Sequence, residues 1–168
     1  RAKDHGLFIA YVNTVGGQDE LVFDGQSVLF DPQGHLVSRG PQFEESLLVV
    51  DIDADDVRPP PDPSAVTEAD LEKIGTPTHY HLSGRVLDSR EPITNVVTAG
   101  LSQLSEVYWA LVTGTRDYVT KSGFAGAIIG LSGGIDSALT TAIASDALGP
   151  DRVTTYFMPS QYTSGQSY

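Results

Sequence analysis

Residues Ser132–Ser137, with the sequence SGGIDS, have the types and spacing of an anion-binding loop. They follow a short apolar run and precede a segment rich in Ala and Leu, which predicts a strand, a glycine turn and a helix in that order. Gly133 and Gly134 let backbone amides approach a ligand without obstruction by a Cβ atom. The unpaired amides and the dipole at the start of the helix favour negative charge at the same place. Ser132 and Ser137 add hydroxyl donors, so the segment predicts a cradle for pyrophosphate.

Asp136 is an unexpected residue in such a cradle, because a carboxylate repels phosphate oxygens. A Mg²⁺ ion between them removes the conflict, since hard oxygen ligands hold the metal and the metal bridges phosphate oxygens. Asp136 is therefore the predicted magnesium ligand, while serine and glycine hold the pyrophosphate.

Other glycine-loop motifs fit this segment less well. A Walker loop requires a lysine that is absent here, and no GxGxxG dinucleotide fingerprint is present. The stretch Gly130–Gly134 (GLSGG) does match the G-x-S-x-G nucleophile elbow. That chemistry needs a histidine base after the serine, and all four histidines precede Ser132. The elbow, and a glycine turn that only packs a helix on a sheet, remain the alternatives.

The elements around the loop predict a βαβ unit. Apolar residues at helical spacing indicate a helix that is interrupted at Gly114 and ends near Ser122-Gly123; they are Leu101, Leu104, Tyr108, Leu111, Val112, Tyr118 and Val119. The continuous apolar run Ala125–Leu131 is typical of a buried parallel strand. A helix over Asp136–Leu148 and a strand over Val153–Phe157 complete the unit.

The first third of the chain predicts a β meander instead. The paired glycines in VGGQDE predict a loop, and Asp24-Gly25 predicts a two-residue hairpin between its flanking apolar runs. A turn is expected at Asp31–Gly34. The strands are expected at Leu7–Asn13, Leu21–Phe23, Ser27–Phe30, His35–Arg39 and Ser46–Ile52.

A proline-rich linker separates the two parts. The run Arg58–Ser64 (RPPPDPS) cannot continue a helix or a central strand. A short helix capped by Thr67 and ended by Gly75 follows it. The expected division is residues 1–57, a linker at 58–97, and a second unit at 98–168.

Composition excludes several classes of function. The formal net charge of −12 argues against a nucleic-acid partner. The chain has no cysteine, so disulfides, thiolate metal sites and a thiol nucleophile are absent from it. No apolar run reaches the length of about 20 residues that a membrane span needs. His79 and His81 have no third ligand nearby, so a loop or linker contact is expected for them rather than a metal site. Asp51–Asp56 departs from a calcium loop at its glycine position and is expected to be a solvated strand end.

The loop resembles the SGGxDS signature of the ATP pyrophosphatase (PP-loop) superfamily. Its surroundings narrow the resemblance to glutamine-dependent NAD⁺ synthetases. Arg116–Phe124, Gly130–Gly149 and Met158–Ser167 resemble the synthetase domain of that family, and Tyr11–Ser27 and Pro41–Asp53 resemble the last part of its nitrilase-like glutaminase domain. The implied fold is α/β: the β-rich end of a nitrilase-like sandwich, then the start of a Rossmann-like parallel-sheet domain of the adenine-nucleotide α-hydrolase type.

The resemblance implies a ligase of NAD biosynthesis that uses ATP and Mg²⁺. Glutamine is hydrolysed by a Glu-Lys-Cys triad, ammonia passes through a tunnel, and ATP adenylates deamido-NAD⁺ before ammonia displaces AMP. The implied ATP-binding residues are Gly130, Leu131, Ser132, Gly133, Gly134, Ile135, Asp136, Ser137 and Met158, with a core role for Met158 as the alternative. Gln161 stands where the family usually has a basic residue. Gly16, Gly17, Asp19, Glu20 and Asp24 resemble a block near the glutaminase site, but turn or hairpin roles are expected for them.

The resemblance also implies that the chain is an internal fragment. The triad is expected upstream of Arg1, so no catalytic residue is expected in this chain, and the isolated chain is expected to be inactive. The full-length protein is expected to be cytoplasmic and homo-oligomeric. Another PP-loop ligase or amidotransferase, and an inert structural fragment, are the alternative functions.

Overall fold

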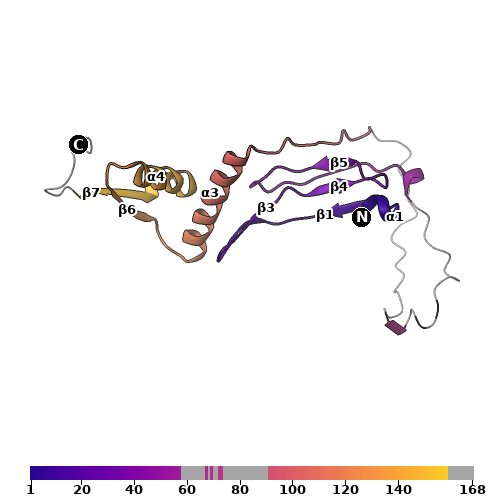
Figure 1. Cartoon of the computed structure of the whole chain (residues 1–168), viewed down its shortest axis with the longest axis horizontal. Helices are drawn as coiled ribbons and strands as arrows, with labels where there is room; N and C mark the ends of the chain where they lie inside the picture. Colours follow the sequence, from indigo (N-terminus) through magenta and orange to yellow (C-terminus); the bar gives the residue numbers. More distant parts are fainter. Residues whose placement is uncertain (58–66, 68, 70–71, 74–90, 159–168) are drawn as a thin grey trace.

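The computed structural model describes residues 1–57, 67, 69, 72–73 and 91–158. Figure 1 shows an elongated molecule in which a β-rich part and an α/β part meet at one long helix. The helices are α1 (Ala2–His5), α3 (Gln103–Lys121) and α4 (Ile135–Leu148), with 3₁₀ turns η1 (Ala54–Asp56) and η3 (Pro150–Arg152). The strands are β1 (Ile9–Tyr11), β2 (Val15–Gln18), β3 (Leu21–Asp24), β4 (Val28–Phe30), β5 (Leu36–Arg39), β6 (Ala127–Leu131) and β7 (Val153–Phe157).

The β-rich part contains an antiparallel sheet of order β1-β4-β5 and a separate antiparallel hairpin of β2 and β3. The predicted strands at β1, β3, β4 and β5 are confirmed, as is the turn at Asp31–Gly34. In that turn the Gly34 amide donates to the Asp31 carbonyl at 3.0 Å, and the Asp31 carboxylate accepts from the His35 amide at 2.7 Å.

The hairpin prediction at Asp24-Gly25 is wrong. β3 pairs with the strand before it, β2, from Val15 opposite Asp24 to Gln18 opposite Leu21. The segment predicted as a glycine loop is therefore a strand. Its turn is Asp19-Glu20, where Asp19 has a φ of 52°. The chain at Gly25 instead crosses from this hairpin into the three-stranded sheet, and β4 pairs with β1 and β5.

The apolar run Ser46–Ile52 also does not form the predicted strand. The far edge of β5 is occupied by residues 96–98: Arg39 donates to the Val96 carbonyl and accepts from the Thr98 amide, both at 3.0 Å. The Ser38 hydroxyl donates to the Val96 carbonyl at 2.7 Å. The run therefore does not take the β5 edge, and its Leu47 is 87% exposed.

The α/β part follows the prediction closely. β6 and β7 are parallel from Ala127 opposite Val153 to Leu131 opposite Phe157, and α4 connects them through η3. Helix α3 runs without the predicted break at Gly114 and ends at Lys121, with Ser122 as its C-cap; the following Gly123 has a φ of 76°. The core of this part consists of Val112, Val119, Ala147 and Leu148, with Tyr108, Ala127, Ile143 and Val153 packed against them.

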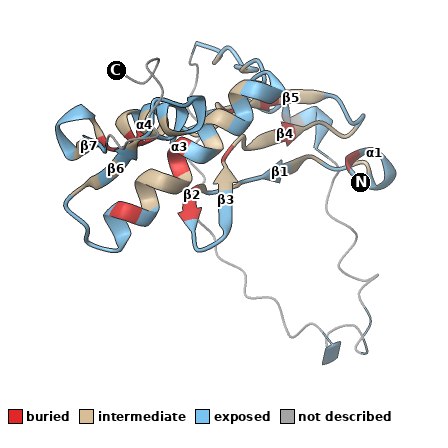
Figure 2. Ribbon diagram, turned by 60° about the vertical axis from the view of Figure 1, so that its left-hand side comes forward, coloured by how far each residue is buried: buried red, intermediate tan, exposed pale blue. Residues whose placement is uncertain are grey.

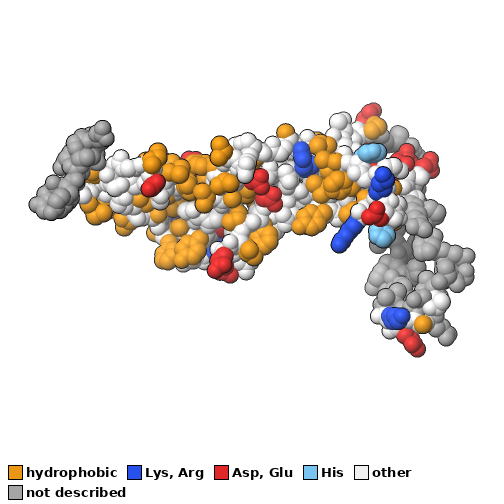
Figure 3. Space-filling view, viewed as in Figure 1, with side chains coloured by type: hydrophobic (Ala, Val, Ile, Leu, Met, Phe, Trp, Pro, Cys, Tyr) orange, Lys and Arg blue, Asp and Glu red, His pale blue; other side chains and the backbone are white. Residues whose placement is uncertain are grey.

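Burial differs from the prediction on both the helix and the strand. Of the apolar residues expected on one face of the helix, Val112 and Val119 are buried, whereas others are exposed: Leu101 (38%), Leu104 (84%), Leu111 (49%) and Tyr118 (63%). Ile128 of β6 is also exposed, so α4 and α3 cover one face of this two-stranded sheet in the described structure. Figure 3 shows hydrophobic side chains on the surface of this end of the molecule.

The segment between the two parts is only partly described. The proline run Arg58–Ser64 and the pair His79 and His81 lie outside the described residues. Of the helix predicted after Thr67, Ala69, Glu72 and Lys73 are described, and all three are helical. None of the helices in the described part of the chain has the length and apolar character required to cross a membrane.

Candidate functional site

The glycine loop lies where β6 ends and α4 begins, at the carboxyl edge of the parallel pair. In open α/β sheets this edge is where ligands bind. Gly133 has a φ of 79°, which an L side chain rarely adopts, and Gly134 is the N-cap of α4. The glycine pair therefore makes the sharp turn that the sequence predicted.

Two serine hydroxyls fasten the loop. Ser132 Oγ lies 3.0 Å from Ser137 Oγ, and Ser137 Oγ accepts from the Ser132 amide at 3.2 Å. The Gly134 amide donates to Ser132 Oγ at 3.3 Å, while Ser137 Oγ donates to the Gly134 carbonyl at 3.0 Å. The structure thus brings Ser132, Gly134 and Ser137 into one hydrogen-bonded turn.

The start of α4 offers amide donors to a ligand. The first intrahelical bond runs from the Ala138 amide to the Gly134 carbonyl at 3.2 Å, and no side chain caps the helix. The preceding amides, including those of Ile135 and Asp136, lack intrahelical acceptors, as in any helix. A phosphate group is a suitable acceptor for such amides.

Asp136 projects from the first turn of α4 and is exposed. The ion pairs found among the described residues do not include it. Within the described residues no three His, Cys, Asp or Glu side chains gather closely enough to hold a metal. A cation at Asp136 would therefore need further ligands, and substrate phosphates are the usual ones for Mg²⁺.

Met158 and Gly130 lie close together beside the loop. Met158 follows β7 and is 72% exposed, so it is not a core residue in this structure. A Cβ atom on Gly130 would lie 2.8 Å from the Met158 Cε atom, which places the methionine side chain over Gly130. Leu131, the last residue of β6, pairs with Phe157 of β7.

The nucleophile-elbow alternative for Ser132 gains no support. The Ser132 hydroxyl is engaged with Ser137 and the Gly134 amide rather than with a histidine. Of the histidines, His5 and His35 fall within the described residues; they belong to α1 and to the turn between β4 and β5, at the other end of the molecule (Figure 1).

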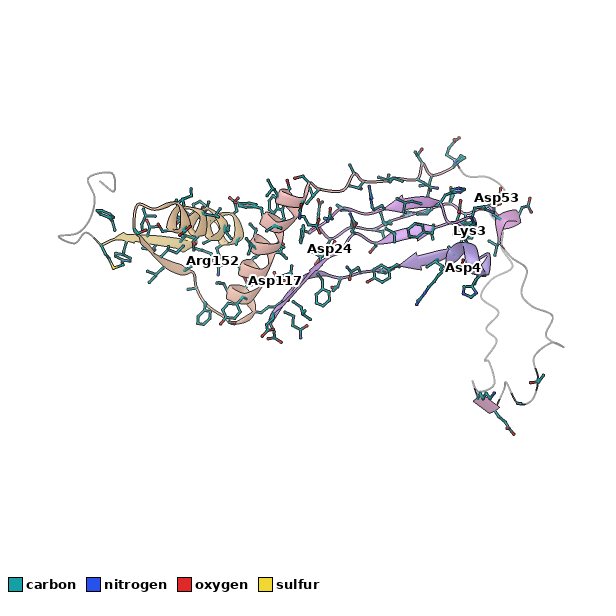
Figure 4. The ribbon with its side chains drawn as sticks, in the orientation of Figure 1. Lys3, Asp4, Asp24, Asp53, Asp117 and Arg152 are labelled. Atoms are coloured by element: carbon teal, nitrogen blue, oxygen red, sulfur yellow. The ribbon has the colours of Figure 1, made fainter. Side chains whose placement is uncertain are left out.

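A second polar cluster, which the sequence analysis did not assign, lies where α3 meets the β2–β3 hairpin. The Gly17 amide donates to Asp117 Oδ2 at 2.8 Å, and Lys121 Nζ donates to the Gly17 carbonyl at 2.6 Å. Figure 4 labels Asp117 on α3 beside the hairpin, and Figure 2 shows that β2 is buried where it faces this helix. The signal in the sequence was Gly16-Gly17, because glycine within a strand often marks a close backbone approach.

Two protein families match separate parts of the chain. Residues 1–61 match the carbon-nitrogen hydrolase family, and residues 107–168 match the NAD synthase family. The glycine loop falls within the second match, whereas Gly17 falls within the first.

Individual relatives match both parts together. A glutamine-dependent NAD(+) synthetase of Aquifex aeolicus is 38% identical over 100% of this chain, which spans 29% of that protein. One from Thermotoga maritima is 39% identical over 99% of the chain, which again spans 29% of the relative. A solved glutamine-dependent NAD+ synthetase of Acinetobacter baumannii, in complex with adenosine diphosphate, superposes with a TM-score of 0.70 at 40% identity, covering 99% of this chain and 25% of that one.

Proposed function

We propose that this chain, which is homologous over its whole length to glutamine-dependent NAD⁺ synthetases, supplies the ATP-pyrophosphate loop of such an enzyme. The reaction is the ATP-dependent amidation of deamido-NAD⁺ by ammonia from glutamine, giving NAD⁺, AMP and diphosphate. The observation that supports it best is the turn at Ser132–Ser137, which combines a left-handed glycine, paired serines and an uncapped helix start.

The chemistry needs an anion site because a carboxylate is a poor acyl donor. One oxygen of the nicotinate carboxylate attacks the α-phosphorus of ATP, and diphosphate leaves. Ammonia then attacks the activated carbonyl carbon, AMP departs with that oxygen, and a proton is lost to solvent. The negative charge that develops on the departing diphosphate is stabilised by donors that are already oriented towards it.

The residues of the loop have distinct roles in this proposal. The free amides at the start of α4 and the open backbone at Gly133 bind the diphosphate oxygens. The hydroxyls of Ser132 and Ser137 hold the loop in shape through their mutual hydrogen bond. Ser137 also donates to the Gly134 carbonyl, so a serine hydroxyl that donates to the diphosphate would do so in place of one of these bonds. Met158, exposed over Gly130, is available for contact with the adenine ring.

Asp136 is the proposed ligand for Mg²⁺. Its exposed carboxylate has no ion-pair partner among the described residues and begins the helix that would hold the phosphates. When bound, Mg²⁺ would neutralise phosphate charge and polarise the phosphoryl oxygens. Because this chain has a formal net charge of −12, such a counterion also reduces repulsion of the nucleotide.

The test is product formation by the full-length protein that contains this chain. We expect NAD⁺ from deamido-NAD⁺, Mg-ATP and either glutamine or an ammonium salt, with one AMP and one diphosphate per NAD⁺. Absence of NAD⁺ with both donors would refute the proposal, and release of ADP in place of AMP would refute cleavage between the α and β phosphates. The isolated chain is expected to give no turnover, and NAD⁺ formed by it would contradict that expectation.

A further inference from the structure

Gly17 is held at both of its backbone polar groups by one face of α3. Its amide donates to Asp117 Oδ2 at 2.8 Å, and its carbonyl accepts from Lys121 Nζ at 2.6 Å. The two side chains also pair with each other, with Lys121 Nζ 3.2 Å from Asp117 Oδ2. We call these three residues the Gly17 clamp. It joins residues about a hundred positions apart, from the parts that match two different families.

The clamp requires glycine on the strand. A Cβ atom on Gly17 would lie 3.0 Å from the Gly114 Cα atom, and one on Gly16 would lie 2.7 Å from Asp117 Oδ2. Gly114 is itself close to the hairpin, because a Cβ atom there would lie 3.2 Å from a methyl group of Val22. Gly114 thus lets the two backbones approach each other, and the neighbouring Thr113 is 1% exposed.

Asp117 is held as a carboxylate. Its side chain is 15% exposed, and Arg116 Nε donates to its second oxygen at 2.9 Å. Burial by itself would raise the pKa of Asp117, but the hydrogen bonds from Gly17, Arg116 and Lys121, with the charge of Arg116, lower the pKa below its ordinary value. Hydrogen bonds to an ionised acceptor are about twice as strong as neutral ones.

The clamp supplies polar contacts at a point of the hairpin where side-chain packing is absent. Gly16 and Gly17 contribute no side-chain packing, and a cavity of about 380 Å³ lies beside them, lined by Asp19, Tyr118 and other residues of α3 and the hairpin. Helix α3 is continuous in sequence with the part that carries the loop, because it is followed through Ser122-Gly123 by β6. The clamp therefore joins the hairpin to that part without contacting the loop itself.

We propose that Asp117 and Lys121 are positioning residues that fix the hydrolase-like part against the synthase-like part, so that nitrogen released from glutamine reaches the acceptor. This positioning role rests on the proposed function. It adds a specific contact that couples glutamine hydrolysis to the amidation of deamido-NAD⁺. Neither residue touches the reacting atoms. Removing the clamp therefore lowers glutamine-dependent amidation while leaving the use of free ammonia intact.

The first test measures the clamp in this chain without any activity. We expect hydrogen exchange at the Gly17 amide to become faster in Asp117→Ala by about tenfold or more, the size of effect that loss of a charge-assisted hydrogen bond gives. Asp146→Ala is the matched control, because Asp146 accepts from the Tyr108 hydroxyl at 2.6 Å and joins α3 to α4 instead. An unchanged rate of hydrogen exchange at the Gly17 amide in Asp117→Ala would show that Asp117 does not hold this amide. An equal acceleration in Asp146→Ala would contradict the clamp in the same way.

The second test compares nitrogen donors in the full-length protein. We expect Asp117→Ala to lower the ratio of glutamine-dependent to ammonia-dependent NAD⁺ formation by about tenfold. Ammonia-dependent formation and glutamine hydrolysis should stay within about twofold of the unmutated protein. Lys121→Met keeps the side-chain stem and should act in the same direction, whereas Asp117→Asn keeps an acceptor for the Gly17 amide and should be intermediate.

The two tests separate failure of the clamp from failure of the proposed function. An unchanged ratio, or an equal fall with both donors, would overturn the positioning role even if the exchange result is as expected. No NAD⁺ from either donor in the unmutated protein would refute the proposed function and the coupling with it. Should Asp117→Ala fail to fold, Lys121→Met decides the question, because it leaves Asp117 paired with Arg116.

Discussion

At the scale of single residues, the loop serines and glycines have roles that local chemistry explains. Gly133 occupies a left-handed conformation, and the hydroxyls of Ser132 and Ser137 satisfy backbone groups that the turn would leave free. Asp136 differs because no described residue forms an ion pair with it, and the turn itself does not need its carboxylate. A residue that is dispensable for the shape of the loop is the better candidate for binding a ligand.

The substitution Asp136→Asn tests this distinction. It keeps the size of the side chain and leaves the turn hydrogen bonds unchanged, but it removes the charge proposed to hold Mg²⁺. In the full-length protein we expect NAD⁺ synthesis to be lost with glutamine and with ammonia, while basal glutamine hydrolysis continues. The loss should amount to about a hundredfold or more, as for other groups that stabilise developing charge.

The matched control is Thr140→Val on the same helix. Thr140 Oγ1 donates to the Asp136 carbonyl at 2.8 Å, so this change perturbs α4 near Asp136 and leaves the carboxylate in place. NAD⁺ synthesis should be largely retained in this variant. Equal loss of synthesis and hydrolysis in Asp136→Asn would contradict a role confined to the nucleotide site.

At the scale of elements, two glycines lie where β6 approaches β7: Gly126 just before β6 and Gly130 within it. A methyl group added at each position would meet a different kind of neighbour. A Cβ atom on Gly126 would overlap the carbonyl oxygen of Arg152, which belongs to the backbone before β7. A Cβ atom on Gly130 would meet the end of the flexible Met158 side chain. The Arg152 carbonyl can move only with the backbone, whereas the Met158 side chain can change rotamer.

Gly126→Ala should therefore destabilise the chain more than Gly130→Ala. For Gly126→Ala we expect a loss of about 1–3 kcal/mol in the free energy of unfolding, typical of overpacking. For Gly130→Ala we expect less than about 1 kcal/mol, because the methionine yields. Urea unfolding of both variants beside the unmutated chain measures the difference, and an equal or reversed order would contradict this packing of β6 on β7.

At the scale of the whole molecule, the hairpin and α3 are joined by two charged side chains, Asp117 and Lys121. Because the pKa of Asp117 is lower in the folded chain than its ordinary value of 3.8, the clamp contributes its full stability above that ordinary value. The contribution falls as the pH drops from 3.8 through the folded pKa, since the unfolded chain then binds a proton first. Acidification should thus loosen the hairpin from α3.

Comparison with Asp117→Asn measures this effect. The variant should be less stable than the unmutated chain near neutral pH, and the difference in free energy of unfolding should shrink as the pH falls below about 4. Urea titrations at pH 7, 5 and 3 are the measurement. A difference that stays constant or grows towards low pH would contradict the lowered pKa of Asp117.

The sequence predicted the α/β part well because its signals are local. An apolar run, two glycines and an Ala-rich segment decide β6, the turn and α4 within about twenty residues. The β-rich part was predicted less well, because an apolar segment becomes a strand only if it pairs with another strand. The local sequence does not show which partner it will meet. Gly16-Gly17 looked like a loop and forms β2, while Ser46–Ile52 looked like a strand and does not form one.

By itself the sequence determined the residue types and spacing of the glycine loop and its resemblance to one class of enzymes, since both depend on short segments of the chain. The tertiary structure decided what α3 contacts. Val112 and Val119 pack against α4, while Asp117 and Lys121 of the same helix hold the backbone of Gly17. Periodicity identifies a buried apolar face, but a polar face that holds a distant glycine has no local signal, because its partner is set only when the chain folds.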